Sequence, residues 1–228
     1  MSYIWIVDFK SSTGVYDEYK TQVSCYVKMS QQATRAGVLR LDKETGMLDD
    51  PAIVEVPPDE IETRWKAFLG LREYYRHIVE PKAKQDRWYP HDGKKYPTIT
   101  GILGCLDKPA LVQWSANMTV DYITSHLSEM KDEEQIAYHL KKAKTAFRQK
   151  SKVAMDTGSI VHDAIHCYLS GGKPEEILGT NDQATNSYLA FLQWADSVRL
   201  KPIALEKVLI DPEHEIGGTC DFLGEINL

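Results

Sequence analysis

The chain has 228 residues, 43% of them hydrophobic, and a formal net charge of −6. This length and composition favour a single domain with a packed core, and no apolar run approaches the ~20 residues that a membrane-spanning helix needs. The acidic balance disfavours nucleic-acid binding on charge alone, because phosphate contacts need Lys and Arg.

The first third of the chain predicts a strand, a helix, a hairpin and a second helix. Short runs of β-branched and aromatic residues predict strands, and apolar residues three or four apart predict helices. Turn residues at 42–51 are expected to join the second and third strands. The strands are expected at 3–8, 37–41 and 52–56, and the helices at 16–29 and, capped by Asp59, from there to about Val79.

The middle of the chain changes in character. Between Glu80 and Tyr96, proline, glycine and charged residues dominate without periodicity, which predicts a linker or surface loop. Helices are expected from Pro97, after Pro109, and over 121–127, 133–152 and 159–169. The stretch 141–152 holds six basic residues and no acid, which indicates either a phosphate-binding surface or a solvated helix face.

The last quarter of the chain predicts a helix followed by two strands. Asn181 is expected to cap the helix, and the strands are expected over 203–210 and 218–226. Strands at both ends of the chain, with helices between them, predict an α/β fold. We expect a central mixed sheet flanked by helices, with a helical elaboration over 97–152.

A DxK triplet, Asp8-Phe9-Lys10, stands at the end of the first predicted strand. Residues two apart on a strand point to the same face of a sheet, so the acid and the lysine should lie side by side. An acid at such a place can bind a divalent metal, and the lysine can orient a water or stabilise a phosphate's charge. The alternative is an ion pair at the end of a strand.

Asp221 follows Gly217 and Gly218 in a predicted strand of apolar residues. A buried carboxylate has to be paired or has to hold a cation, and the alternative is a turn acid satisfied by backbone N–H groups. His162 and His166 stand four apart on one predicted helix, a spacing found in zinc sites. The HExxH pattern is missing and no CxxC pair exists, which argues against a zinc or iron–sulfur site and leaves core histidines as the alternative.

Four motifs together resemble the RecB-like branch of the PD-(D/E)XK nucleases. They are a GxxxH helix at 158–162, a GxxD strand at 218–221, a DxK strand at 8–10 and a QxxxY helix at 22–26. The segment 96–103, followed by a helix with Trp114, is similar to the mitochondrial genome maintenance exonuclease family and its phage relatives. The resemblance covers most of the chain.

The order of the motifs departs from that family, in which GxxxH and GxxD come before DxK and QxxxY. Moving residues 1 to about 85 behind Leu228 restores the family order, so we expect one circularly permuted domain over 1–228. In this domain, residues 1–80 correspond to the second half of the family order and residues 97–228 to the first half. Residues 81–96 join the old termini. Tyr3 and Leu228 should then lie close together, joining two antiparallel strands.

The resemblance implies a centre for one divalent cation, Mg²⁺ or Mn²⁺. Its ligands would be His162, Asp221, Asp8 and the backbone carbonyl of Phe9, and oxygen-rich ligands suit these hard cations. Glu206 lies where relatives often have a glutamate and is a possible addition. Many relatives have an acid in place of His166, which makes a ligand role for this histidine doubtful.

The resemblance also implies catalytic roles for three further residues beside the aspartates. Lys10 would position the attacking water or stabilise the charge on the phosphate. Gln22 and Tyr26 would orient the DNA or the lysine. The implied reaction is the hydrolysis of phosphodiester bonds in single-stranded DNA or at DNA ends, releasing nucleotides with 5′-phosphates.

The DNA partner needs cations for its phosphates and aromatic faces for its bases. The aromatic candidates are Trp88, Tyr89 and Tyr96, whereas Trp114 is expected in the core. The cationic candidates lie in the basic run, with Lys141, Lys144, Arg148 and Lys152 foremost.

Two other functions stay open: a DNA-binding or recombination accessory module on the same fold, and an unrelated scaffold in which the motifs arise by chance. No membrane association is expected. The absence of an export signal and the scattered cysteines suggest the cytoplasm of a bacterial or phage-infected cell. The oligomeric state stays open, with a swapped dimer as one possibility.

Overall fold

The computed structural model describes residues 3–80 and 88–227. The chain divides into two compact units. The sheet unit comprises Met1–Cys105 and Ile160–Leu228, and the helical unit comprises Leu106–Ser159. No helix among the described residues is both long and apolar enough to cross a membrane.

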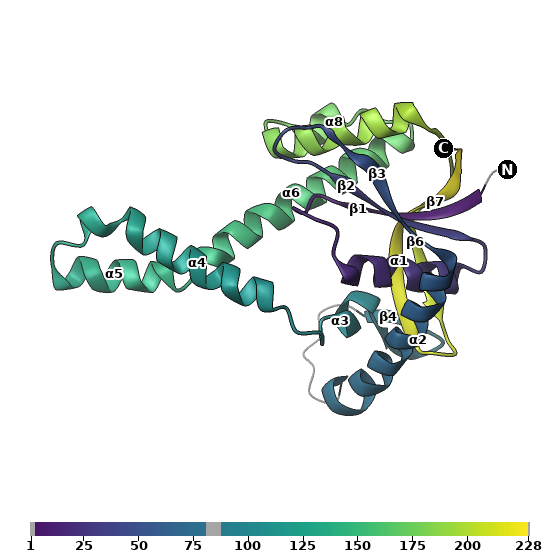
Figure 1. Ribbon diagram of the computed structural model, residues 1–228, viewed down its shortest axis with the longest axis horizontal. Helices are drawn as coiled ribbons and strands as arrows, with labels where there is room; N and C mark the ends of the chain where they lie inside the picture. The colour runs from purple at the N-terminus through teal and green to yellow at the C-terminus, as the bar shows by residue number, and fades with distance from the viewer. Residues whose placement is uncertain (1–2, 81–87, 228) are drawn as a thin grey trace. The chain divides into compact units, whose positions relative to one another are not determined.

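A five-stranded mixed sheet forms the centre of the sheet unit (Figure 1). The strands lie in the order β3-β2-β1-β7-β6, and only β1 and β2 run parallel. Helix α1 (Asp17–Ser30) connects this parallel pair, as a crossover between parallel strands requires. The strands are β1 Tyr3–Lys10, β2 Arg35–Leu41, β3 Leu48–Val56, β6 Arg199–Asp211 and β7 Ile216–Asn227.

Helices cover both faces of the sheet, and each face has its own apolar core. Alternation along β1 shows the division, because Ile6 belongs to one core while Trp5 and Val7 belong to the other. The α/β prediction is therefore confirmed. The first core is covered by α1, α2 (Pro58–Tyr74) and α3 (Ile99–Leu103), and the second by α8 (Asp182–Ser197) and the last part of α6 (Ala146–Leu169).

The two ends of the described chain meet in the sheet. Tyr3 of β1 pairs with Ile226 of β7, and the two strands are antiparallel. This is the strand pair that the restored motif order requires. Leu228 lies outside the described residues, and the permutation itself stays a prediction.

The prediction of a linker or surface loop over 80–96 is wrong for the second half of this segment. Strands β4 (Trp88–His91) and β5 (Lys94–Pro97) form a hairpin. Its turn consists of Asp92 and Gly93, both with positive φ of 47° and 75°, which suits a tight two-residue turn. The first half of the segment, 81–87, lies outside the described residues.

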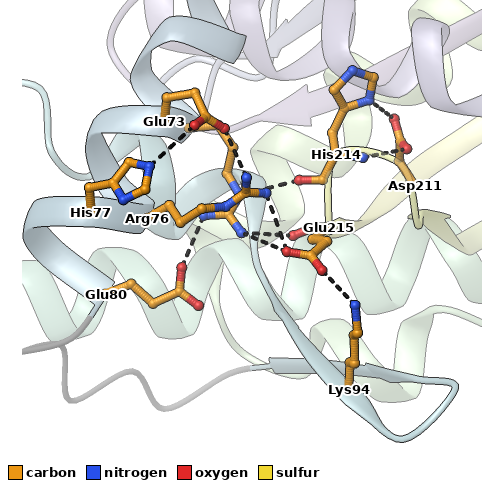
Figure 2. A network of polar contacts seen from close by, with 9 residues as sticks. Glu73, Arg76, His77, Glu80, Lys94, Asp211, His214 and Glu215 are labelled. Atoms are coloured by element: carbon orange, nitrogen blue, oxygen red, sulfur yellow. Dashed lines mark hydrogen bonds and ion pairs between the residues drawn. The ribbon is translucent and has the colours of Figure 1, made fainter.

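A network of polar contacts attaches this hairpin and α2 to the turn between β6 and β7 (Figure 2). Arg72, only 3% exposed, donates to the backbone carbonyls of His214 and Glu215, each at 3.3 Å. The Glu215 carboxylate accepts from Arg76 at 3.3 Å and from Lys94 at 2.8 Å. These contacts hold the glycine-rich start of β7 in a fixed place.

Several predicted helix boundaries are wrong. The helix expected over 133–152 is interrupted near Lys144, and the helix expected to begin at Ser159 is instead the last part of α6, which begins at Ala146. Residues 121–127 mostly belong to α4. The helical unit thus contains α4 (Pro109–Ser125), a 3-10 turn at Leu127–Glu129, α5 (Glu133–Ala143) and the first part of α6.

Caps explain the remaining differences at helix starts. Pro57, and not Asp59, precedes α2, where Pro58 takes the first helical position and needs no N–H partner. Helix α3 begins at Ile99 and not at Pro97, and Thr98 caps it by accepting from the Gly101 N–H at 2.8 Å. The short α7 (Glu175–Leu178) and the π-helical turn Tyr75–Val79 are not predicted by the sequence as separate elements. The Asn181 cap of α8 is confirmed, since its side chain accepts from Ala184.

Candidate metal centre

Three carboxylates lie abreast on three neighbouring strands. The pairing of β1 with β7 ends at Val7 and Phe222, one residue before Asp8 and Asp221, and the charge of Asp8 acts on the Asp221 carboxylate. In the register of β6 and β7, the residues on either side of Glu206 pair with those on either side of Asp221, so these two acids lie opposite one another. Like charges directly opposite one another in a sheet are destabilising, so this row of acids calls for a compensating cation.

The backbone of β6 is distorted where Glu206 joins the row. The φ of Glu206 is 46°, in the left-handed region that residues with a Cβ adopt only at a cost of about 1–2 kcal/mol. Strain of this kind inside a strand is typical of functional sites. The distortion leaves the Glu206 carboxylate 4.0 Å from Nδ1 of His162.

His162 reaches the row from α6. Its Nδ1 lies 3.5 Å from Oδ2 of Asp221, and its ring meets the edge of Phe9 with centroids 6.4 Å apart. One ligand atom each from His162, Glu206 and Asp221 lie within 4.8 Å of one another. The structure thus brings together two of the predicted ligands and the residue considered a possible addition. His166 is exposed and lies outside this group.

Asp8 and Lys10 form an ion pair beside that group. Asp8 Oδ2 lies 2.7 Å from Lys10 Nζ, and the Asp8 side chain is almost fully buried. The lysine also lies over the ring of Tyr19, 5.1 Å from its centroid. Burial lowers the pKa of Lys10, but the carboxylates of Asp8 and Asp221 outweigh it and raise the pKa overall. The lysine is therefore a fixed positive charge next to the acids.

Asp221 and His162 both hold their protons more tightly than usual. Burial, followed by the charge of Asp8, raises the pKa of Asp221 to about 7, although Phe9 N–H donates to its Oδ2 at 2.8 Å. Burial lowers the pKa of His162, but Glu206 and Asp221 reverse this and raise it to about 9. Such paired shifts in one place are typical of functional sites.

Gln22 and Tyr26 lie beneath the site, where both are buried. The Gln22 amide donates to the Tyr26 hydroxyl at 2.9 Å. A Cβ added to Gly218 would lie 2.5 Å from a carbon of the Tyr26 ring, so only glycine fits there. The QxxxY helix and the GxxD strand are thus in direct contact, and in this conformation the pair supports the strands rather than facing solvent.

The three aromatic candidates for base stacking differ in exposure. Tyr96 is only 4% exposed, so its prediction as a stacking face is wrong. Tyr89 is half-buried, packs on Gly217 and has its hydroxyl 2.7 Å from that of Thr219. Trp88 is half-buried. In the helical unit Trp114 is also only half-buried, so its prediction as a core residue is wrong.

The basic run lies in the helical unit, and all of its cationic side chains are exposed: Lys141, Lys142, Lys144, Arg148, Lys150 and Lys152. Exposure fits both interpretations of this run.

At the sheet site, reasoning from sequence misses Tyr19, because its position under Lys10 depends on how α1 packs on β1 and no motif marks it.

The chain matches no family model, no curated protein and no solved structure. The motifs and the geometry of the site therefore carry the functional proposal.

Proposed function

We propose that the chain is a metal-dependent DNA exonuclease of the RecB-like PD-(D/E)XK class with its motifs in circularly permuted order. The observation that carries the proposal is the row of carboxylates formed by Asp8, Asp221 and Glu206, with His162 and Lys10 against it. A structural ion pair needs one acid and one base, whereas this site gathers three acids with mutual repulsion.

The residues fit a hard divalent cation such as Mg²⁺ or Mn²⁺. Asp8, Asp221 and Glu206 offer carboxylate oxygens and His162 offers a ring nitrogen, with the Phe9 carbonyl as a further oxygen. When bound, the cation would activate a water and neutralise charge on the scissile phosphate. Burial, followed by the charge of Asp8, raises the pKa of Asp221, and a bound cation would relieve the repulsion between these two carboxylates.

Lys10 supplies a positive charge, which the carboxylates of the site cannot supply. Its ammonium lies on the same face of β1 as Asp8 and is partly open to solvent, with 21% of the side chain exposed. From there it can hold the attacking water or donate to a phosphate oxygen as negative charge develops. Tyr19 and Asp8 hold the side chain in position, which limits the reorganisation needed during the reaction.

The strand arrangement supports the permuted order. The GxxD strand β7 and the DxK strand β1 are antiparallel neighbours, although more than 200 positions separate the motifs in the sequence. The QxxxY helix α1 follows β1 directly and contacts Gly218. The contacts among these motifs in space support the proposal.

DNA is the substrate that the resemblance and the basic run favour, either as a single strand or at duplex ends. The exposed Lys141, Lys144, Arg148 and Lys152 could contact phosphates, which would explain binding by a chain with a negative net charge. Such an enzyme would act in the cytoplasm of a bacterial or phage-infected cell.

A digestion assay tests the proposal. Single strands and duplexes, blocked at the 5′ or the 3′ end and labelled internally, are incubated with the purified chain and Mg²⁺, Mn²⁺ or EDTA. We expect metal-dependent release of short 5′-phosphorylated products, absent with EDTA and with Asp221→Asn. Binding of DNA without cleavage under any metal would instead indicate the accessory module.

A further inference from the structure

A second group of residues of the types that bind metals lies wholly within the helical unit. His126 follows α4, Glu129 lies in the 3-10 turn and His139 lies in α5. One ligand atom from each lies within 4.8 Å of the other two. This group has two imidazoles and one carboxylate, whereas the group in the sheet unit has one imidazole and two carboxylates, so the two differ in chemistry.

The closest pair in this group is spaced as ligands of one ion. Nε2 of His139 and Oε2 of Glu129 are 3.5 Å apart, at the limit of a hydrogen bond. Two atoms that each lie ~2.1 Å from a tetrahedral zinc are about 3.4 Å apart. The pair therefore needs almost no movement to bind zinc together.

Tyr122 orients both histidines. Its backbone carbonyl lies 2.8 Å from Nδ1 of His126 and can only accept, so this nitrogen carries the proton and Nε2 keeps its lone pair for a metal. Its hydroxyl lies 3.4 Å from Nδ1 of His139, and its ring stacks on His126 with centroids 4.2 Å apart. Metal-bound histidines commonly have such a partner on the second ring nitrogen.

The helical unit lacks the apolar core that would otherwise hold it together. Its buried residues are His139, Ala143 and Thr157, and α4 has none. The most buried large side chain of the unit is thus a histidine. Small units with so little core usually depend on a disulfide or a structural metal.

We propose that His126, Glu129 and His139 bind one Zn²⁺, which fastens α4, the 3-10 turn and α5 to one another. Two imidazoles and one carboxylate are a usual zinc ligand set, and no cysteine is needed. The cysteine spacing that argues against zinc therefore does not bear on this site. A pocket beside Glu129 and His139 leaves room for a water as fourth ligand; its other lining residues are Ser128, Lys131, Gln135 and Tyr138.

Zinc titration of the chelator-stripped full chain tests this proposal. Asp221→Asn serves as the background, because it weakens the centre in the sheet unit and leaves the helical unit unchanged. We expect this background to bind one Zn²⁺ per chain by calorimetry at pH 7.5. Co²⁺ should give the intense visible absorption bands of four-coordinate cobalt, which an octahedral oxygen site does not give.

Three variants in that background decide the ligands. His126→Gln and Glu129→Gln should each weaken Zn²⁺ binding at least tenfold and abolish the cobalt bands. Tyr122→Phe should weaken binding by roughly tenfold, because it removes the hydroxyl that orients His139. His166→Gln removes an exposed histidine of the sheet unit and should change nothing, which makes it the matched control.

The Glu129 side chain is 60% exposed, so Glu129→Gln should fold normally even if a substitution of the buried His139 does not. Zn²⁺ should also slow proteolytic cleavage within the helical unit of the background protein, and not of Glu129→Gln. Absence of Zn²⁺ binding by the background, or equal binding by His126→Gln and Glu129→Gln, would overturn the proposal. All three readouts, calorimetry, cobalt absorption and proteolysis, are independent of nuclease activity.

Discussion

Different groups neutralise the two aspartates of the sheet site, Asp8 and Asp221. Asp8 faces Lys10 at 2.7 Å, whereas the Asp221 carboxylate accepts the Phe9 N–H and has a partly exposed histidine at 3.5 Å. A cation bound by both would therefore add more to the neutralisation of Asp221. In the proposed centre Asp8 would link the cation to the lysine, so its loss should affect catalysis more than folding.

Asp8→Ala is expected to lower the rate of metal-dependent cleavage by at least about a hundredfold, since it removes a metal ligand and frees the lysine. The melting temperature should stay within a few degrees of the parent. Asp163→Ala, which removes an exposed acid next to His162 in the sequence, is the control and should retain the parent rate. Near-normal cleavage by Asp8→Ala would show that the metal assignment is wrong.

The raised pKa values predict how metal affinity depends on pH. Without metal, the pKa of Asp221 is about 7 and that of His162 about 9, and both groups must lose a proton before they can bind a cation. Raising the pH from 6 to 9 removes the Asp221 proton and about half of the His162 protons, so Mn²⁺ affinity should rise through this range. Calorimetry at four pH values measures it. In His162→Gln the rise should level off above about pH 8, and a flat profile for the parent would contradict the prediction.

At the scale of elements, the contact between α1 and β7 can be tested at one glycine. A Cβ on Gly218 would lie 2.5 Å from the Tyr26 ring and 3.2 Å from Ile99, so Gly218→Ala should destabilise the fold by about 1–3 kcal/mol. Gly70→Ala is the matched control, because no atom lies within 4 Å of its added Cβ. In the interior of α2 this change should stabilise by about 0.5–1 kcal/mol. Urea unfolding of both variants measures the difference.

The elements that sequence reasoning predicts correctly are those with a local signal. Strand β1 and helix α1 follow from periodicity, and the α8 cap follows from Asn181. Gly158 suggests a break before a new helix, yet α6 continues through it because one glycine costs only about 1 kcal/mol in a long helix. The β4–β5 hairpin escapes prediction because prolines and charges hide its alternation, and packing of Tyr89 on Gly217 helps to hold it.

The two candidate sites differ in how much the sequence predicts. Motifs of short range point to Asp8, Asp221 and His162; the proximity of the two aspartates follows from the pairing of β1 and β7, and that of His162 from the packing of α6 on the sheet. The direction in which the Glu206 side chain points depends on a distortion of the backbone that no pattern of residues predicts. The grouping of His126 with His139 depends on how α4 and α5 pack, which spacing alone does not specify.

At the scale of the whole molecule, the charge distribution predicts how the proposed DNA binding depends on salt. Replacing Lys144, Arg148 and Lys152 with Ala should weaken single-strand affinity and reduce the slope of log K against log salt by ~0.7 for each phosphate that is no longer neutralised. Fluorescence anisotropy at several salt concentrations measures the slope. An unchanged slope would identify the run as a solvated helix face. The control replaces three exposed lysines of the sheet unit, Lys66, Lys173 and Lys201.

The proposed permutation predicts that the chain can be reconnected. Tyr3 and Ile226 are paired neighbours, so a short link from β7 to β1 would close a hairpin, and new ends can be placed between Glu80 and Trp88. The reconnected chain should keep the melting temperature and the metal-dependent cleavage of the parent. A chain opened between Thr219 and Cys220, inside β7, should fail to fold because it divides the central strand pair.

Reconnection should also change the folding rate in a predictable direction. In the present chain, β1 and β7 pair across almost the whole sequence, so their contact forms only after a long loop closes. In the reconnected chain the same contact is local, and local contacts speed folding. Stopped-flow refolding should therefore be faster for the reconnected chain while the unfolding rate changes little. Slower refolding with an intact sheet would show that the β1–β7 pair forms late, after the helices have packed on β2 and β6.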